Sequence, residues 1–389
     1  TTFQFDNELP RLPLPSIEDT LANLDRSVKG CEFTPEEWTA FEAAREEAKT
    51  ALIKAQEVLK ARDAANEDNY LGVWWEEYAY LRNRYPNVVN TNVFAIRDSD
   101  FVASEEDGCG EKPAPVLADP VERAALVALE VMEFRRYLAK ELLPVDKFIG
   151  KPMCMRQYHK FFSTRVPGQE CDRMHISEPK DVDEVHFMVR GQSFFVKMRP
   201  SKESDKTINF QETVAAIRYA IDALKDKGEC QVGVLTSAER TKWATAWEKL
   251  VAHNDENNAI LQRILNAATT ICIDLDEDSK IETIDQGILQ ASHFQSTNRW
   301  YDRSVLKMVS ANGIATENGD HSSMDAIVMA SVPTDAQIMW GKGFLKKGGD
   351  KVPASGGFKA ADTVVLGVFD VSDEVKTMIA EAIVALEEV

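Results

Sequence analysis

The sequence predicts a layered α/β fold, because helical and strand patterns alternate along much of its 389 residues. The runs that predict strands are 184–198 (a hairpin around a glycine), 228–236 and 304–313. The intervening runs that predict helices are 211–227, 238–252 and 256–270. Hydrophobic residues make up 44% of the chain and charged residues 28%, which is typical of a globular protein with a sizeable core.

The N-terminal part is predicted to be helical. Ser16 and Asp19 are typical capping residues in front of a first amphipathic helix. Residues 34–65 begin with Thr-Pro-Glu-Glu and are rich in Ala, Glu, Lys and Leu, so they predict one long helix. The aromatic segment 74–85 predicts a further helix that ends before Pro86.

Three further segments complete the expected element order. Residues 104–119 are polar and rich in Pro and Gly, which predicts a loop. Residues 119–144 predict a helix, because Asp119 and Pro120 are typical of a helix start. The last segment, 362–389, predicts one strand and one helix, and we expect the chain to stop there within a larger architecture.

Charge and cysteine usage exclude several classes of protein. The net charge is −19 and no long cluster of Lys and Arg occurs, so nucleic acid is not an expected partner. The six cysteines form no C-x-x-C pair, which indicates free thiols. No apolar run approaches the roughly 18–20 residues that span a bilayer, so we expect no transmembrane segment.

Metal and phosphate-loop motifs are not found. The histidines lack H-E-x-x-H or cysteine-pair spacing, so no metal is expected. The segment GKGFLKKGG at 341–349 does not match G-x-x-x-x-G-K-[ST] and predicts a mobile surface loop. Lys342, Lys346 and Lys347 in this loop are nevertheless available to an anionic ligand.

His321 and Asp325 form an H-x-x-x-D motif just after an apolar run. At this spacing a carboxylate can hold an imidazole in one tautomer and so orient a base. The alternative is an ordinary surface histidine in a turn rich in Asn and Gly. For Arg299 and Asp302 the alternative to a binding role is a structural ion-pair cluster. Residues 151–168 are rich in Met and aromatic side chains, and the alternative to a binding role for them is core packing.

Taken in order, these segments resemble the carnitine/choline acyltransferase family. The matching segments are LPRLPLPSIEDTL (9–21), WWEEYAYLRNRYP (74–86), KPMCMRQYHKFFSTRVPG (151–168), VHFMVRGQSFFVKM (185–198), VGVLTSAERTKWATAWEKL (232–250), STNRWYDRSVLKMVSANG (296–313) and then the histidine segment. Together they cover essentially the whole chain, and their shared order is more specific than any single motif.

The resemblance implies reversible transfer of an acyl group between coenzyme A and the hydroxyl of carnitine or choline, with no metal. It implies that His321 is the general base and that Asp325 orients it. It also implies that Arg299, Asp302 and Tyr158 form the wall of the substrate site. The residues that contact acyl-coenzyme A are not identified. The alternative is a catalytically inactive acyltransferase-like structural or accessory subunit of a larger assembly.

The resemblance further implies a two-layer domain with a mixed sheet, of the chloramphenicol acetyltransferase type. The expected divisions are an N-terminal helical segment at 1–95, the catalytic-histidine domain at 96–365 and the start of a second similar domain at 366–389. We expect a partner chain or a C-terminal part to complete the site. A role in fatty acid metabolism in the mitochondrion follows from the same resemblance, with the peroxisome or the cytoplasm as alternatives.

Overall fold

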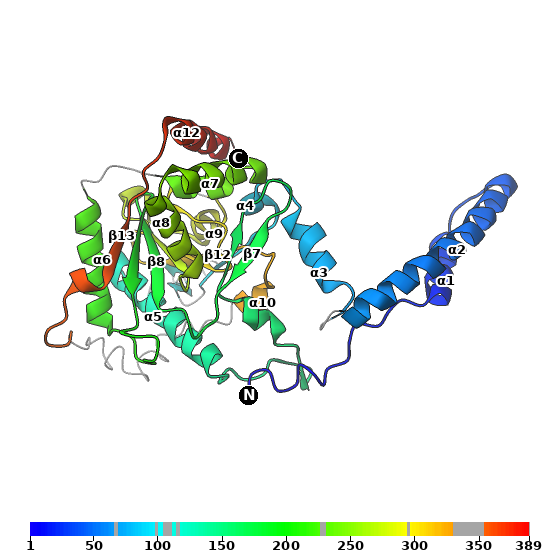
Figure 1. Cartoon of the computed structure of the whole chain (residues 1–389), viewed down its shortest axis with the longest axis horizontal. Helices are drawn as coiled ribbons and strands as arrows, with labels where there is room; N and C mark the ends of the chain where they lie inside the picture. Colours follow the sequence, from blue (N-terminus) through cyan, green and yellow to red (C-terminus); the bar gives the residue numbers. More distant parts are fainter. Residues whose placement is uncertain are drawn as a thin grey trace. The chain divides into compact units, whose positions relative to one another are not determined.

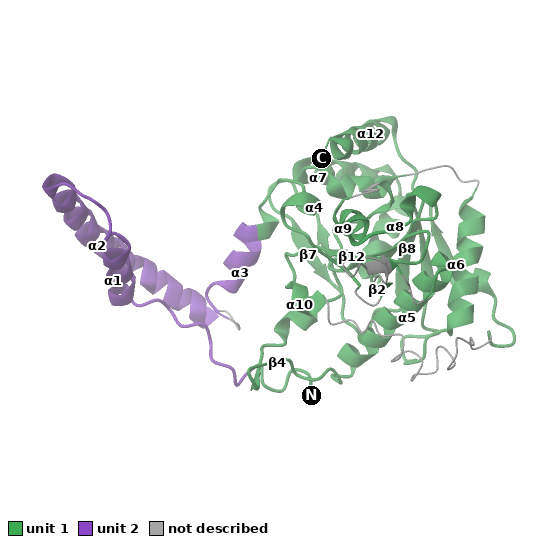
Figure 2. Ribbon diagram, turned by 180° about the vertical axis from the view of Figure 1, so that it is seen from behind, with its two compact units in different colours: residues 1–6, 80–389 green, residues 7–79 purple. Residues whose placement is uncertain are grey.

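The computed structural model describes eight stretches of the chain, which are 1–65, 69–97, 100–103, 111–113, 117–225, 231–293, 296–329 and 354–388. The chain divides into two compact units, one of residues 1–6 with 80–389 and one of residues 7–79 (Figure 2). The predicted loop with Lys342, Lys346 and Lys347 lies outside the described residues.

The smaller unit contains the predicted N-terminal helices. They are α1 (Ile17–Ser27) and α2 (Pro35–Ala65), and the Ser16 side chain caps α1 by accepting a hydrogen bond from the Asp19 backbone N–H at 3.0 Å. Arg45 of α2 donates two hydrogen bonds to Asp25 of α1, at 2.7 and 2.8 Å. Both helices are therefore confirmed, together with the predicted cap.

The aromatic segment forms a helix of an unexpected kind. It contains α3 (Gly72–Trp75) followed by a π-helical turn, η1 (Glu76–Leu81). The boundary between the two units falls within η1, between residues 79 and 80. A π-turn is rare and often occurs near functional sites.

The larger unit is built on a seven-stranded sheet in the order β1-β12-β11-β10-β8-β9-β13. The strands are β1 (Val93–Ile96), β8 (Glu184–Val189), β9 (Gln192–Lys197), β10 (Thr270–Ile273), β11 (Leu306–Val309), β12 (Ala315–Gly319) and β13 (Val364–Gly367). Strands β8, β10 and β11 are mutually parallel, whereas every other neighbouring pair is antiparallel. The sheet is therefore mixed.

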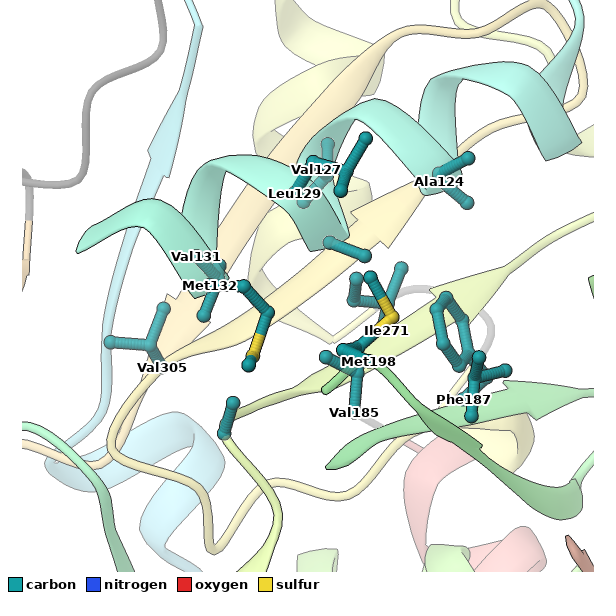
Figure 3. Packing of buried hydrophobic residues seen from close by; sticks show 14 of the residues in the cluster. Ala124, Val127, Leu129, Val131, Met132, Val185, Phe187, Met198, Ile271 and Val305 are labelled. Atoms are coloured by element: carbon teal, nitrogen blue, oxygen red, sulfur yellow. The ribbon is translucent and has the colours of Figure 1, made fainter. Parts of the chain in front are cut away.

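Helices cover both faces of this sheet (Figure 1). The long helix α5 (Pro120–Ala139) packs with Val185, Phe187 and Ile271 (Figure 3). Helix α6 (Phe210–Leu224) contributes to the same apolar cluster. Helices α7 (Arg240–His253) and α8 (Asp255–Asn266) pack on the other face, with Met188 and Cys272. The described unit thus has three layers rather than the expected two, because its central strands are buried on both faces.

The strand predictions were only partly correct. The hairpin at 184–198 and the strand in 304–313 are confirmed, but residues 232–237 form a 3₁₀ helix, η4, instead of a strand. A short buried apolar run does not distinguish these states by pattern. Strand β10 was missed because the helix pattern of 256–270 runs into it. Strand β12 was not predicted, since ATENG is rich in polar residues and lacks an apolar strand pattern.

Short elements connect the layers. They are α4 (Asn87–Asn90), β2 (Phe101–Ala103), β3 (Glu111–Pro113), β4 (Lys147–Phe148), β5 (Lys151–Pro152), η3 (Arg156–Lys160), β6 (Ser163–Val166), β7 (Arg173–Ile176), η5 (Glu277–Ser279), α9 (Ile284–Ser292), η6 (Ser296–Asn298), α10 (Ala326–Met329) and η7 (Ala360–Asp362). Strand β3 lies where a loop was expected, and the predicted helix of 119–144 ends at Ala139 as α5.

The predicted C-terminal strand and helix are confirmed as β13 and α12 (Asp373–Glu387). Strand β13 pairs antiparallel with β9 at the sheet edge. Helix α12 contributes Val375 and Ala382 to the apolar cluster that contains Trp243 of α7. The helix therefore packs on earlier parts of the same unit, and the domain divisions at residues 95 and 365 stay predictions.

Candidate active site around His321

His321 lies in the turn between β12 and α10. Because β12 runs antiparallel to β11, its end lies beside the amino end of β11, where Asn318 pairs with Leu306. The Asp320 backbone N–H donates to the Arg303 carbonyl at 2.9 Å and anchors the turn. Gly319 permits this close approach, since a Cβ there would collide with the Ser304 carbonyl oxygen.

The two ring nitrogens of His321 face different partners. Nε2 lies 3.1 Å from Oδ1 of Asp325, the carboxylate of the predicted H-x-x-x-D pair. Nδ1 lies 3.2 Å from the hydroxyl of Tyr80, and the two rings meet edge to face with centroids 5.4 Å apart. The His321 side chain is 25% exposed and that of Asp325 is 69% exposed. The imidazole is thus oriented by neighbours yet remains accessible.

Asp325 is in turn held by Gln157 of η3. Gln157 Nε2 donates to Asp325 Oδ2 at 3.0 Å, and the Asp325 backbone N–H donates to Gln157 Oε1 at 2.9 Å. Because Oδ2 is engaged by Gln157, Oδ1 is the carboxylate oxygen that faces His321. Neither Gln157 nor Tyr80 was predicted as a site residue, although both lie in segments that resemble the family, 151–168 and 74–86.

A buried ion-pair network underlies the turn. The Arg165 guanidinium contacts Asp172 Oδ2 at 2.6 Å and Asp320 Oδ1 at 3.5 Å. Arg240 contacts the same Asp172 oxygen at 2.7 Å. Burial raises the pKa of Asp172, but Arg240 and Arg165 lower it more, so this pKa lies below its ordinary value. Asp172 is therefore held as the anion that compensates two buried arginines.

Asp302 belongs to the same network. Its carboxylate accepts hydrogen bonds from Arg240 at 2.7 Å, from Trp243 at 2.7 Å and from Asn87 at 3.1 Å. Its backbone carbonyl accepts from the Arg165 N–H at 2.8 Å. Asp302 is fully buried, so these contacts brace the segment behind His321.

Arg299 and Tyr158 lie elsewhere. Arg299 makes two hydrogen bonds to Asp274, at 2.8 and 2.7 Å, just beyond the carboxyl end of β10. Because β10 and β11 are parallel, their carboxyl ends lie on the same side of the sheet. His321 lies beside the amino end of β11, so Arg299 and His321 are at opposite ends of these strands. The Tyr158 hydroxyl donates to Asp146 at 2.7 Å, and its ring is in the core. Their assignment to a substrate-site wall stays a prediction.

The described residues contain neither a metal-binding cluster nor a membrane-spanning helix. No group of three or more His, Cys, Asp or Glu side chains in the described stretches is arranged to hold a metal ion. Among the described helices, none combines the length and the apolar composition that a bilayer crossing requires.

Comparison with known proteins identifies the family. The model of the family described as "Choline/Carnitine o-acyltransferase" matches residues 12–389, which is nearly the whole chain. The chain belongs to this family. The resemblance drawn from the ordered motifs is thereby confirmed.

Individual relatives are carnitine acyltransferases of several kinds. The chain is 28% identical over 362 residues to the peroxisomal carnitine O-octanoyltransferase of Bos taurus, which covers 90% of this chain and 57% of the relative. It is 26% identical to the liver isoform of carnitine O-palmitoyltransferase 1 of Homo sapiens, over 84% of this chain and 41% of the relative. It is 24% identical to the human carnitine O-acetyltransferase, over 78% of this chain and 48% of the relative. The chain therefore spans about half the length of these relatives.

Proposed function

We propose that this chain carries the general base of a carnitine acyltransferase site and serves reversible acyl transfer between coenzyme A and the hydroxyl of carnitine or choline. Membership of the family supports the reaction class. The observation that carries the assignment of the base is that His321 contacts a carboxylate through one nitrogen and a hydroxyl through the other.

The geometry accounts for the proton transfers. An ionised carboxylate only accepts hydrogen bonds, so the proton of the neutral His321 ring lies on Nε2, toward Asp325. The lone pair is then on Nδ1, where the Tyr80 hydroxyl shows that an O–H group fits within 3.2 Å. A substrate alcohol that takes the place of the Tyr80 hydroxyl there would give its proton to the ring as its oxygen attacks the thioester carbonyl carbon.

The second half of the reaction returns that proton. When the tetrahedral intermediate collapses, the carbon–sulfur bond breaks and the sulfur of coenzyme A takes the proton from the imidazolium. The products are the acyl ester and free coenzyme A, and no acyl-enzyme is required. The exposed Cys154 therefore has no role as a nucleophile in this scheme.

Further roles belong to the same proposal. We assign Asp325 the role of orienting His321 and Asp302 the role of bracing the segment behind it. Arg299 and Tyr158 are proposed for more distant parts of the substrate-site wall. We also propose that the mixed sheet is of the chloramphenicol acetyltransferase type and that a C-terminal part or a partner chain completes the site. A mitochondrial or peroxisomal location is proposed, and the name of the bovine relative supports the second.

The test is release of coenzyme A thiol by the purified protein from acetyl- and longer acyl-coenzyme A, with carnitine or choline as acceptor. His321→Ala should lose nearly all turnover while it keeps the fold, since the turn is partly exposed. His253→Ala is the matched control, because His253 also pairs with a carboxylate, that of Asp370. No thiol release by the wild type, with His321→Ala indistinguishable from it, would instead favour the inactive accessory subunit.

A further inference from the structure

Gln157 holds Asp325 with both ends of its amide. Its Nε2 donates to the carboxylate at 3.0 Å, and its Oε1 accepts from the Asp325 backbone N–H at 2.9 Å. Only one orientation of the amide satisfies both bonds, since a carboxylate needs a donor and an N–H needs an acceptor. The pair of contacts therefore fixes where the carboxylate lies and which of its oxygens faces His321.

The residue that makes this contact is itself firmly placed. Gln157 lies on η3, next to Tyr158, which is 2% exposed and donates to Asp146 at 2.7 Å. At the start of the same turn, the Met155 backbone N–H donates to Asp6 at 2.9 Å, and the Met155 side chain is fully buried. The amide thus projects from an anchored turn toward Asp325.

Asp325 needs such an anchor because its side chain is 69% exposed. An exposed carboxylate has several accessible rotamers, and only some of them reach an imidazole four residues earlier. Each alternative rotamer would leave Nε2 of His321 without its acceptor. The neutral ring could then carry its proton on either nitrogen, and only one tautomer leaves the lone pair on Nδ1, the nitrogen that the Tyr80 hydroxyl approaches.

We propose that Gln157 is a positioning residue that fixes, through Asp325, the tautomer and orientation of His321. The effect of Gln157 on turnover rests on the proposed function. Its effect on the His321 tautomer depends only on the contacts among Gln157, Asp325 and His321. Gln157 acts through Asp325 and not on the substrate. Its loss therefore lowers kcat by about tenfold, the equivalent of one hydrogen bond to a charged group, and leaves KM nearly unchanged.

Two substitutions separate this role from packing. Gln157→Leu removes both hydrogen bonds. Gln157→Glu keeps the shape and the acceptor for the Asp325 N–H, but places a second carboxylate against the first, so it should impair the enzyme at least as strongly. Gln169→Leu is the matched control, because Gln169 also donates to an exposed carboxylate, that of Glu248, at 3.1 Å.

The first measurement needs no activity. Long-range ¹H–¹⁵N NMR correlations of the whole chain, at a pH where the imidazole is neutral, should show His321 as the single Nε2–H tautomer in the wild type and in Gln169→Leu. In Gln157→Leu the ring nitrogens should shift toward the tautomer mixture of free imidazole. An unchanged tautomer in both Gln157 variants would overturn the proposal, whether or not the protein transfers acyl groups.

The second measurement is a double-mutant cycle on kcat. Gln157→Leu should cost about tenfold in the wild type and nothing further in the Asp325→Ala background, because the route through Asp325 is already broken. An equal loss in both backgrounds would contradict the route through Asp325. If the wild type shows no turnover while the tautomer shift is present, the proposed function fails and the positioning role of Gln157 stands.

Discussion

Arg165 donates a hydrogen bond of 2.8 Å to the backbone carbonyl of Tyr80, the residue whose hydroxyl faces Nδ1 of His321. The same guanidinium contacts Asp320, the residue directly before His321. One buried cation therefore ties together the two segments that present the imidazole and its hydroxyl neighbour, although 241 residues separate Tyr80 from His321.

Loss of the Tyr80 hydroxyl should make Nδ1 of His321 more available to the substrate alcohol. Tyr80→Phe keeps the ring and the backbone contact to Arg165 but deletes the hydrogen bond to Nδ1. A neutral hydrogen bond contributes about 1 kcal/mol and the substrate alcohol has to displace this one, so we expect an increase of up to about fivefold in kcat/KM. Steady-state acyl transfer measures it, and Tyr85→Phe, at a side chain that is 69% exposed, should have no effect.

The anion Asp172 should be essential to stability. Asp172→Asn leaves the buried guanidinium groups of Arg165 and Arg240 without that charge. Removal of one partner from a buried ion pair costs about 3–5 kcal/mol, so the free energy of unfolding should fall by this amount in urea titrations. Asp373→Asn, which breaks an exposed pair with Lys376, should scarcely change it. Equal effects of both substitutions would contradict the network.

His186 should make the fold sensitive to mild acid. Its ring is fully buried in the sheet, between Thr270 and Ser193, and burial, helped by the charge of Arg303, holds its pKa well below 6.5. The folded protein binds this proton less readily than the unfolded chain, so the stabilisation is present above pH 6.5 and is lost as the pH falls below it. The loss should approach about 1.4 kcal/mol per pH unit.

The measurement for His186 is the free energy of unfolding between pH 7 and pH 5. His186→Gln should remove this part of the pH dependence, whereas His175→Gln, at a histidine that contacts Asn266 at the surface, should keep it. The prediction is wrong if wild type and His186→Gln lose stability in parallel as the solution is acidified.

Cysteine reactivity should follow burial. Burial raises the pKa of the Cys272 thiol to about 12, because the thiolate would lose its hydration in the core of the sheet. Cys31 and Cys154 are exposed. Iodoacetamide at pH 8 should therefore label Cys31 and Cys154 in the folded protein and Cys272 only after unfolding, as peptide mass spectrometry would show. Early labelling of Cys272 would mean that strand β10 opens readily.

Local patterns were sufficient where a segment carries its own signal. The Ser16 cap, the Ala- and Glu-rich composition of α2 and the glycine between β8 and β9 each predict an element from neighbouring residues alone. The pattern failed at η4, where a short apolar run is buried in a turn, and at β12, whose polar residues are buried by contacts from outside the strand. Burial, which decided both cases, is not a local property.

For the candidate site, the sequence by itself determined the H-x-x-x-D spacing, the ordered motifs and hence the family. Only the tertiary structure decided which side chains hold His321. Tyr80 and Gln157 reach the imidazole and its carboxylate from segments 241 and 168 residues away from their partners. Sheet order and buried ion pairs bring these segments together, and no spacing within a single segment encodes such contacts.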